Sequence, residues 1–159
     1  MCCCAIRTAA GGTTTPFHAA AQLLARAASH RRPGQYQLQA AILACHIEAQ
    51  RWEDTDWAQI VVLYDMLLHV APSPIIRLNR AIALRYLTGP DAALTELDTL
   101  APALERHHLY HATRAELLRE LGLPEQAQLA NRRALELVTN PAQRKLLEQR
   151  IHQPGGAGF

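Results

Sequence analysis

Three histidines, His107, His108 and His111, are the residues whose types and spacing best suit metal chemistry. Side chains three or four positions apart project from one face of a helix, which is the arrangement that zinc ligation requires. Glu105 and Glu116 lie at spacings that do not complete a set of ligands. We therefore interpret the histidines as packing or partner-contacting residues and predict no metal site.

The cysteines predict no reactive centre. Cys2, Cys3 and Cys4 are consecutive, so their side chains point apart, whereas zinc sites leave about two to four residues between thiolates. Cys45 and His46 are neighbours, and neighbouring side chains in a helix point about 100° apart, too far for a nucleophile and its base. Cys45 is therefore interpreted as a small core residue. Because the four cysteines lack the spacing of a disulfide framework, they favour a reducing compartment.

An acidic group, Glu53, Asp54 and Asp56, lies between Trp52 and Trp57 and suggests a glycosidase or a metal site. Carboxylates at the start of a helix also interact favourably with the helix dipole and cap its free amides, and we favour this structural role. No acid and base stand at a credible catalytic spacing. The sequence therefore predicts that the protein is not an enzyme and that it binds no cofactor.

Arginines are better candidates for binding a partner. Arg77 and Arg80 share a helical face with Asn79 nearby, and a guanidinium can hold a carboxylate with two hydrogen bonds. The alternative is that these arginines are solvated or paired within the chain. Polar residues at an expected helix start can equally contact a partner or cap the helix. The candidate partner-binding residues are Tyr36, Gln39, Arg77, Asn79, Arg80, His108, His111 and Arg114.

Helices must position these residues, because apolar side chains recur every three or four positions and no stretch alternates like a strand. Pro74, Pro90, Pro124 and Pro141 stand where proline is favoured, at the first position of a helix. N-caps are expected at Asp56, Ser73 and Asn140. We expect helices at residues 17–30, 36–50, 57–70, 75–87, 90–100, 106–121, 124–138 and 142–152.

The chain of 159 residues is long enough for one compact domain. We expect a disordered leader over 1–16, a single α-helical domain over 17–152 and a disordered tail over 153–159. The net charge of +2 produces no strong field toward nucleic acid or a membrane, and no apolar run is long enough to span a bilayer. The amino terminus lacks the pattern of a secretory signal, which predicts a cytoplasmic protein.

An internal repeat is the most specific pattern in the sequence. Five residues recur with the tetratricopeptide period of 34 positions, either unchanged or replaced by small or polar residues. Such a pattern lets paired helices approach closely and stack on the next pair. We therefore predict an all-α fold of antiparallel helix pairs, stacked as a short superhelix like that of tetratricopeptide repeats. The recurring residues are Ala81, Leu84, Ala93, Leu97 and Leu100, followed by Ala115, Leu118, Ala127, Asn131 and Ala134.

Four segments, residues 32–46, 53–65, 72–81 and 108–122, together resemble the carboxy-terminal extension of a group of bacterial extracytoplasmic-function (ECF) sigma factors. The resemblance covers residues 17–152. It implies a regulatory, protein-binding domain in transcription initiation, whose partner is the sigma modules or RNA polymerase.

In that family the extension follows two sigma modules, region 2 and region 4, which bind the promoter. Neither module is found in this sequence, so no direct contact with nucleic acid is expected. The chain is then an excised domain, a truncated product or a fragment with a different leader. Two alternatives remain open: a stand-alone protein-binding scaffold, and a small helical metal-binding protein or enzyme based on the histidines. The oligomeric state is not predicted.

Overall fold

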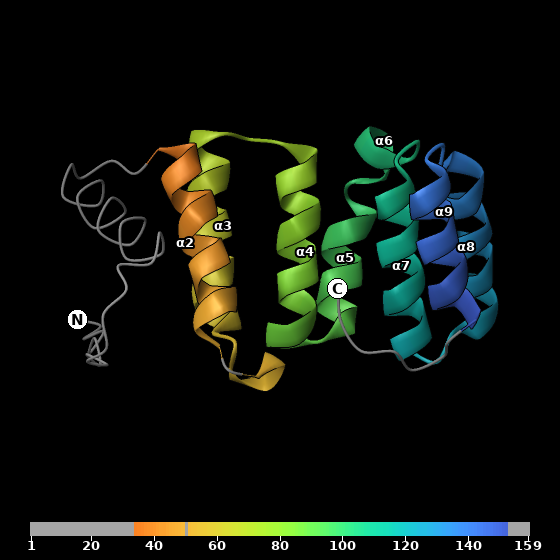
Figure 1. Ribbon diagram of the computed structural model, residues 1–159, viewed down its shortest axis with the longest axis horizontal. Coiled ribbons are helices and arrows are strands. Elements are labelled where there is room, and N and C mark those ends of the chain that lie inside the picture. The colour runs from red at the N-terminus through yellow and green to blue at the C-terminus, as the bar shows by residue number, and fades with distance from the viewer. Residues whose placement is uncertain (1–33, 50, 153–159) are drawn as a thin grey trace.

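The computed structural model describes residues 34–49 and 51–152 (Figure 1). The predicted leader, the predicted helix at 17–30 and the predicted tail lie outside these residues. The described part is helical and contains no strand, which confirms the predicted all-α class there. Its α-helices are α2 (Gln35–Glu48), α3 (Trp57–Val70), α4 (Pro74–Thr88), α5 (Pro90–Asp98), α6 (Ala101–Leu104), α7 (His108–Glu120), α8 (Pro124–Leu137) and α9 (Pro141–His152).

Helix starts follow from local chemistry, as the sequence predicts. Each of the four predicted prolines is the first residue of its helix, where it removes no hydrogen bond that the helix would use. Asp56 Oδ1 accepts a hydrogen bond of 2.9 Å from the backbone amide of Gln59. Ser73 Oγ accepts one of 3.3 Å from Ile75, and Asn140 Oδ1 accepts one of 2.9 Å from Ala142. The three predicted N-caps are therefore confirmed.

Two short elements were not predicted. A 3-10 helix, η1 (Trp52–Asp54), precedes α3, and the four-residue helix α6 fills the connection between α5 and α7. Single turns of this kind show no periodicity in sequence, because the helical pattern needs a window of about 11–18 residues. The predicted helices 90–100 and 106–121 are consequently too long, since α5 ends at Asp98 and α7 begins at His108.

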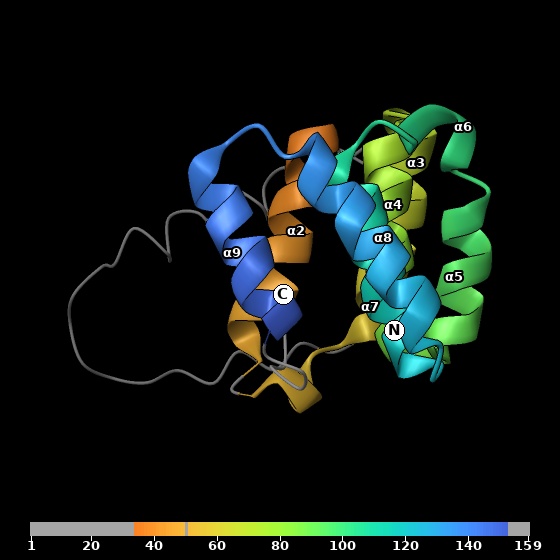
Figure 2. The ribbon, with the colours of Figure 1, turned by 90° about the vertical axis from the view of Figure 1, so that its right-hand side faces the viewer.

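From α2 to α8 the helices follow one another along the array in chain order, and their connections alternate between its two ends, whereas α9 appears between α7 and α8 (Figure 1). Each helix from α2 to α5 packs on the next, α5 packs on α7, and α7 packs most extensively on α8. Along the array, α5 lies on the opposite side of the stack from α2 and α9 (Figure 2). At the turn between α4 and α5, Gly89 adopts a φ of 100°, a conformation that residues with a side chain rarely adopt.

The core is a series of apolar clusters that follow the array. The first joins α2, α3 and α4, the second joins α4 to α7, and the third joins α7 and α8. Leu84 packs against the first and second clusters, and Leu94 packs against the second and third, so the clusters are continuous. Of the ten residues in the 34-residue repeat, all but Leu84 are buried. The recurring positions are therefore core positions.

Among the described residues, no helix has the length and apolar character needed to cross a bilayer.

Candidate protein-binding surfaces

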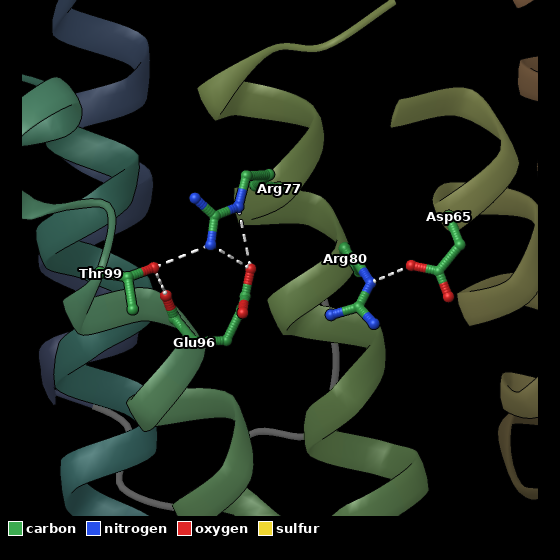
Figure 3. A network of polar contacts seen from close by, with 5 residues as sticks. All are labelled: Asp65, Arg77, Arg80, Glu96 and Thr99. Atoms are coloured by element: carbon green, nitrogen blue, oxygen red, sulfur yellow. Dashed lines mark hydrogen bonds and ion pairs between the residues drawn. The ribbon is translucent and has the colours of Figure 1, made fainter. Parts of the chain in front are cut away.

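Arg77 and Arg80 leave α4 in opposite directions (Figure 3). Arg77 donates to Glu96 Oε1 on α5 from Nε at 3.0 Å and from Nη2 at 2.8 Å, and Nη2 also donates to Thr99 Oγ1 at 2.9 Å. Arg80 Nε donates to Asp65 Oδ1 on α3 at 2.7 Å. Both guanidiniums are thus paired within the chain, which is the alternative to partner binding left open by the sequence. They connect α4 to the helices on its two sides.

The contact between Arg80 and Asp65 recurs one repeat later. Arg114 lies 34 positions after Arg80, and its Nε donates to Asp98 Oδ1 at 3.1 Å. In both cases an arginine on the first helix of a hairpin pairs with an aspartate on the second helix of the preceding hairpin. We name these the two interhairpin ion pairs. Sequence reasoning missed them, although the 34-residue spacing of Arg80 and Arg114 is a signal that can find such pairs.

Arg80→Ala, Asp65→Ala and the double variant test the first interhairpin ion pair. The side chains are 21% and 46% exposed, so we expect a coupling free energy of about 0.2–1 kcal/mol from urea unfolding at low salt. The coupling should shrink in about 1 M salt, where the Debye screening length is about 3 Å. A double-mutant cycle of Arg80→Ala and Asp91→Ala, in which Asp91 is exposed, serves as the control and should show no coupling. A coupling that does not depend on salt would contradict this account.

The three histidines do not converge on one point. His107 and His108 stack, with ring centroids 5.3 Å apart and planes 11° from parallel. Burial and the charge of His107 lower the pKa of His108 below its usual value, which favours the neutral ring. His111 Nε2 donates to the backbone carbonyl of Glu105 at 2.7 Å. In the part of the chain that the structure describes, no three His, Cys, Asp or Glu residues are placed to hold a metal ion.

A polar cleft of about 570 Å³ runs between α5, α6, α7 and α8. Two of the predicted residues, His111 and Arg114, line this polar cleft together with Arg133. Tyr110 also contributes, and burial raises the pKa of its hydroxyl group. The charged lining is mixed, because the carboxylates of Asp98 and Glu105 face the same space as the two guanidiniums.

A second cleft, of about 410 Å³, opens between α2, α3 and α4, and we name it the aromatic cleft. Trp52 and Trp57 meet edge to face at 4.9 Å, Trp57 stacks on Tyr86 at 4.3 Å, and His46 meets the edge of Trp57 at 5.4 Å. Arg85 lies over the ring of Tyr86, 5.2 Å from its centroid. The lining residues are Leu43, His46, Trp52, Trp57, Ile60, Tyr64, Asn79, Ile82 and Ala83.

An exposed stripe on α2 adjoins the aromatic cleft. Tyr36, Gln39, Leu43 and Ile47 are spaced by three or four residues, so they occupy one face of the helix, and all four are exposed. Leu43 belongs both to this α2 stripe and to the cleft lining. Sequence reasoning singled out Tyr36 and Gln39 but missed Leu43. An apolar residue on a helix is ordinarily assigned to the core, but Leu43 is 58% exposed.

The predicted partner-binding residues therefore do not form one site. They are distributed among intrachain ion pairs, the histidine stack, the α2 stripe, and the aromatic and polar clefts. Cys45, which the sequence assigns to the core, is half-buried and packs against the first core cluster. The signal that marks the aromatic cleft in the sequence is the pair of tryptophans, since the chain contains two and both line it.

Comparison with known proteins found a relative in Rhizobium meliloti (strain 1021), an uncharacterized protein that is 41% identical over 132 residues. The match covers 83% of this chain and 31% of that protein, so the chain spans about a third of the relative's length. No protein-family model matches the chain. No solved structure matches it either.

Proposed function

We propose that this chain is the helical-repeat regulatory domain of an ECF sigma factor, and that it binds a protein surface on the sigma modules or on RNA polymerase. The observation that carries the proposal is the agreement between the 34-residue repeat and the packing. The same period relates buried residues of successive hairpins and the arginines of the two interhairpin ion pairs, whose aspartates are 33 positions apart. The resemblance of residues 17–152 to the sigma-factor extension supplies the transcriptional context.

The proposed architecture is a short superhelix of the tetratricopeptide type. Its hairpins are α2 with α3, α4 with α5, and α7 with α8, and α9 packs on the last. Small residues favour such stacking, because Ala81, Ala93 and Ala115 are fully buried and let neighbouring helices approach closely. Stacked hairpins present extended surfaces that accept peptides or helices.

Two further observations support the proposal. The Rhizobium relative extends well beyond the matched segment, so it has room for other modules in the same chain. Arg77, Arg80 and Arg114 are already paired with carboxylates, so they are not available to hold the phosphates of a nucleic acid. The proposed domain therefore acts by protein contact in the cytoplasm, where RNA polymerase works.

A binding assay with purified RNA polymerase from the organism that encodes this chain tests the proposed function. We expect saturable binding to the core enzyme or to the isolated sigma modules, and no binding to promoter DNA alone. Arg77→Ala is a matched control, because its guanidinium already pairs with Glu96, and it should retain binding. Failure to bind both polymerase and sigma modules would refute the sigma-factor assignment and favour a scaffold for an unrelated partner.

A further inference from the structure

We propose that the aromatic cleft, extended by the α2 stripe, binds an amphipathic basic segment of a partner protein. This inference rests on the proposed protein-binding function and names the chemistry that the partner must present. The segment places apolar side chains against the tryptophans and Leu43, and it places Lys or Arg side chains beside the carboxylates that directly follow Trp52 in the chain.

The apolar half of the proposal rests on exposure and shape. Leu43 is 58% exposed, Ile47 is 48% exposed and Trp52 is 37% exposed, although all three are large hydrophobic side chains. They adjoin a cleft whose volume lies in the range of ligand-binding clefts, about 300–1,000 Å³. Apolar side chains on one face of a helix, docked in a hydrophobic groove, are a recurrent mode of peptide recognition.

The cleft is open because of how the helices pack. α4 packs closely on α3 and α5, whereas α2 packs on α3. Residues of α3, among them Ile60 and Tyr64, therefore form part of the lining between α2 and α4. Burial raises the pKa of the Tyr64 hydroxyl, which favours its neutral form.

The charge around the cleft determines which sign of charge the partner segment must carry. The segments that line the cleft, residues 34–71 and α4, carry five carboxylates and four arginines. The three arginines of α4 are each paired with a carboxylate, which leaves Arg51 as the one arginine of these segments outside an ion pair of the described residues. Asp65 pairs with Arg80, and Asp56 caps α3. The other three carboxylates are exposed. Within the described residues, no ion pair neutralises the two carboxylates that directly follow Trp52. Those three carboxylates are Glu48, Glu53 and Asp54.

The polar cleft is the weaker candidate for a charged segment. Its two guanidiniums and two carboxylates oppose each other, so it favours neither sign strongly. Arg114 is moreover already paired with Asp98. The exposed carboxylates of Glu53 and Asp54, which follow Trp52 in the chain, also disfavour nucleic acid near the aromatic cleft. These comparisons favour the aromatic cleft and a basic protein segment.

Intrinsic fluorescence tests the proposal directly, because both tryptophans of the chain line the cleft. The probe is a synthetic peptide of about 14 residues with Leu on one helical face and Lys on the other. We expect a saturable change in tryptophan emission, with at least about tenfold weaker binding for the same peptide carrying Glu in place of Lys. Equal binding of the two peptides would overturn the charge argument, and no binding would overturn the proposal.

Matched variants locate the binding surface while leaving both tryptophans in place. Leu43→Asp should weaken binding at least about tenfold, whereas Leu129→Asp on α8, where the side chain is 63% exposed, should leave it unchanged. Equal losses would refute the assignment to the aromatic cleft. Glu53→Gln combined with Asp54→Asn changes exposed side chains, and it should weaken binding of the Lys peptide and reduce its dependence on salt. Unchanged salt dependence would contradict the electrostatic role.

Two outcomes separate this inference from the proposed function. If the Lys peptide fails to bind while the protein still captures polymerase, the cleft assignment is wrong and the proposed function stands. If the peptide binds but neither polymerase nor sigma modules are captured, the cleft assignment stands and the sigma-factor role is wrong. Size-exclusion chromatography without peptide identifies a second copy as the occupant, because a dimer broken by Leu43→Asp would overturn the proposed basic partner.

Discussion

Leu97→Ala is expected to lower the free energy of unfolding by about 2–5 kcal/mol. Leu97 lies on α5, is 0% exposed and belongs to the core cluster that includes Leu78, Tyr110 and Leu117. Truncation removes apolar contacts and leaves a cavity between helices that cannot fully collapse. Urea unfolding followed by circular dichroism measures the loss.

Leu129→Ala is the matched control for this truncation. The same atoms are removed from a side chain that is 63% exposed, so the change should stay within about 0.5 kcal/mol. If the two variants lost equal stability, α5 would not be the centre of a packed core. A loss below about 1 kcal/mol at Leu97 would contradict its burial in the same way.

Ala93→Leu is expected to cost about 1–3 kcal/mol, for the opposite reason. Ala93 is 0% exposed in α5, and its neighbours in the core cluster leave no room for three further carbon atoms. Its counterpart 34 positions later, Ala127, is also buried, which indicates that a small residue is required at this point of each hairpin. Thermal and urea unfolding report the change.

Ala92→Leu is the control for Ala93→Leu, because Ala92 is the preceding residue of the same helix and is exposed. Both variants add the same side chain to the same helix, so differences in helix propensity cancel. We expect Ala92→Leu to change stability by less than about 0.5 kcal/mol. Equal effects at the two positions would show that close approach of helices is not what requires alanine.

Helix starts were predictable because the sequence signal and the structure are both local. Pro90 and the caps Asp56 and Ser73 act within a few residues, and each functions as expected. The four-residue helix α6 was not predictable in this way. It is defined by the buried side chains of Leu100 and Leu104, and those contacts depend on helices distant in sequence.

Candidate binding residues were harder to predict than helices. Arg77 and Arg80 share a helical face in sequence, yet their long side chains extend to different neighbouring helices. Whether such an arginine is available to a partner depends on whether a carboxylate of a neighbouring helix lies within reach. The spacing of residues within one helix does not show which carboxylates the neighbouring helices present. The exposure of Leu43 could not be predicted for a related reason. The apolar pattern of α2 does not show which face of this helix other helices cover.

Packing in chain order has a consequence for how the molecule assembles. Since most partners of a helix are its sequence neighbours, a nucleus formed by one hairpin can grow by adding the next without closing long loops. Folding of this kind should be fast, and amide hydrogen exchange should be slowest in α3, α4, α5 and α7, which are covered on two sides. Fraying should instead concentrate at α9, which packs on α8 less extensively than the other neighbouring helices pack on each other.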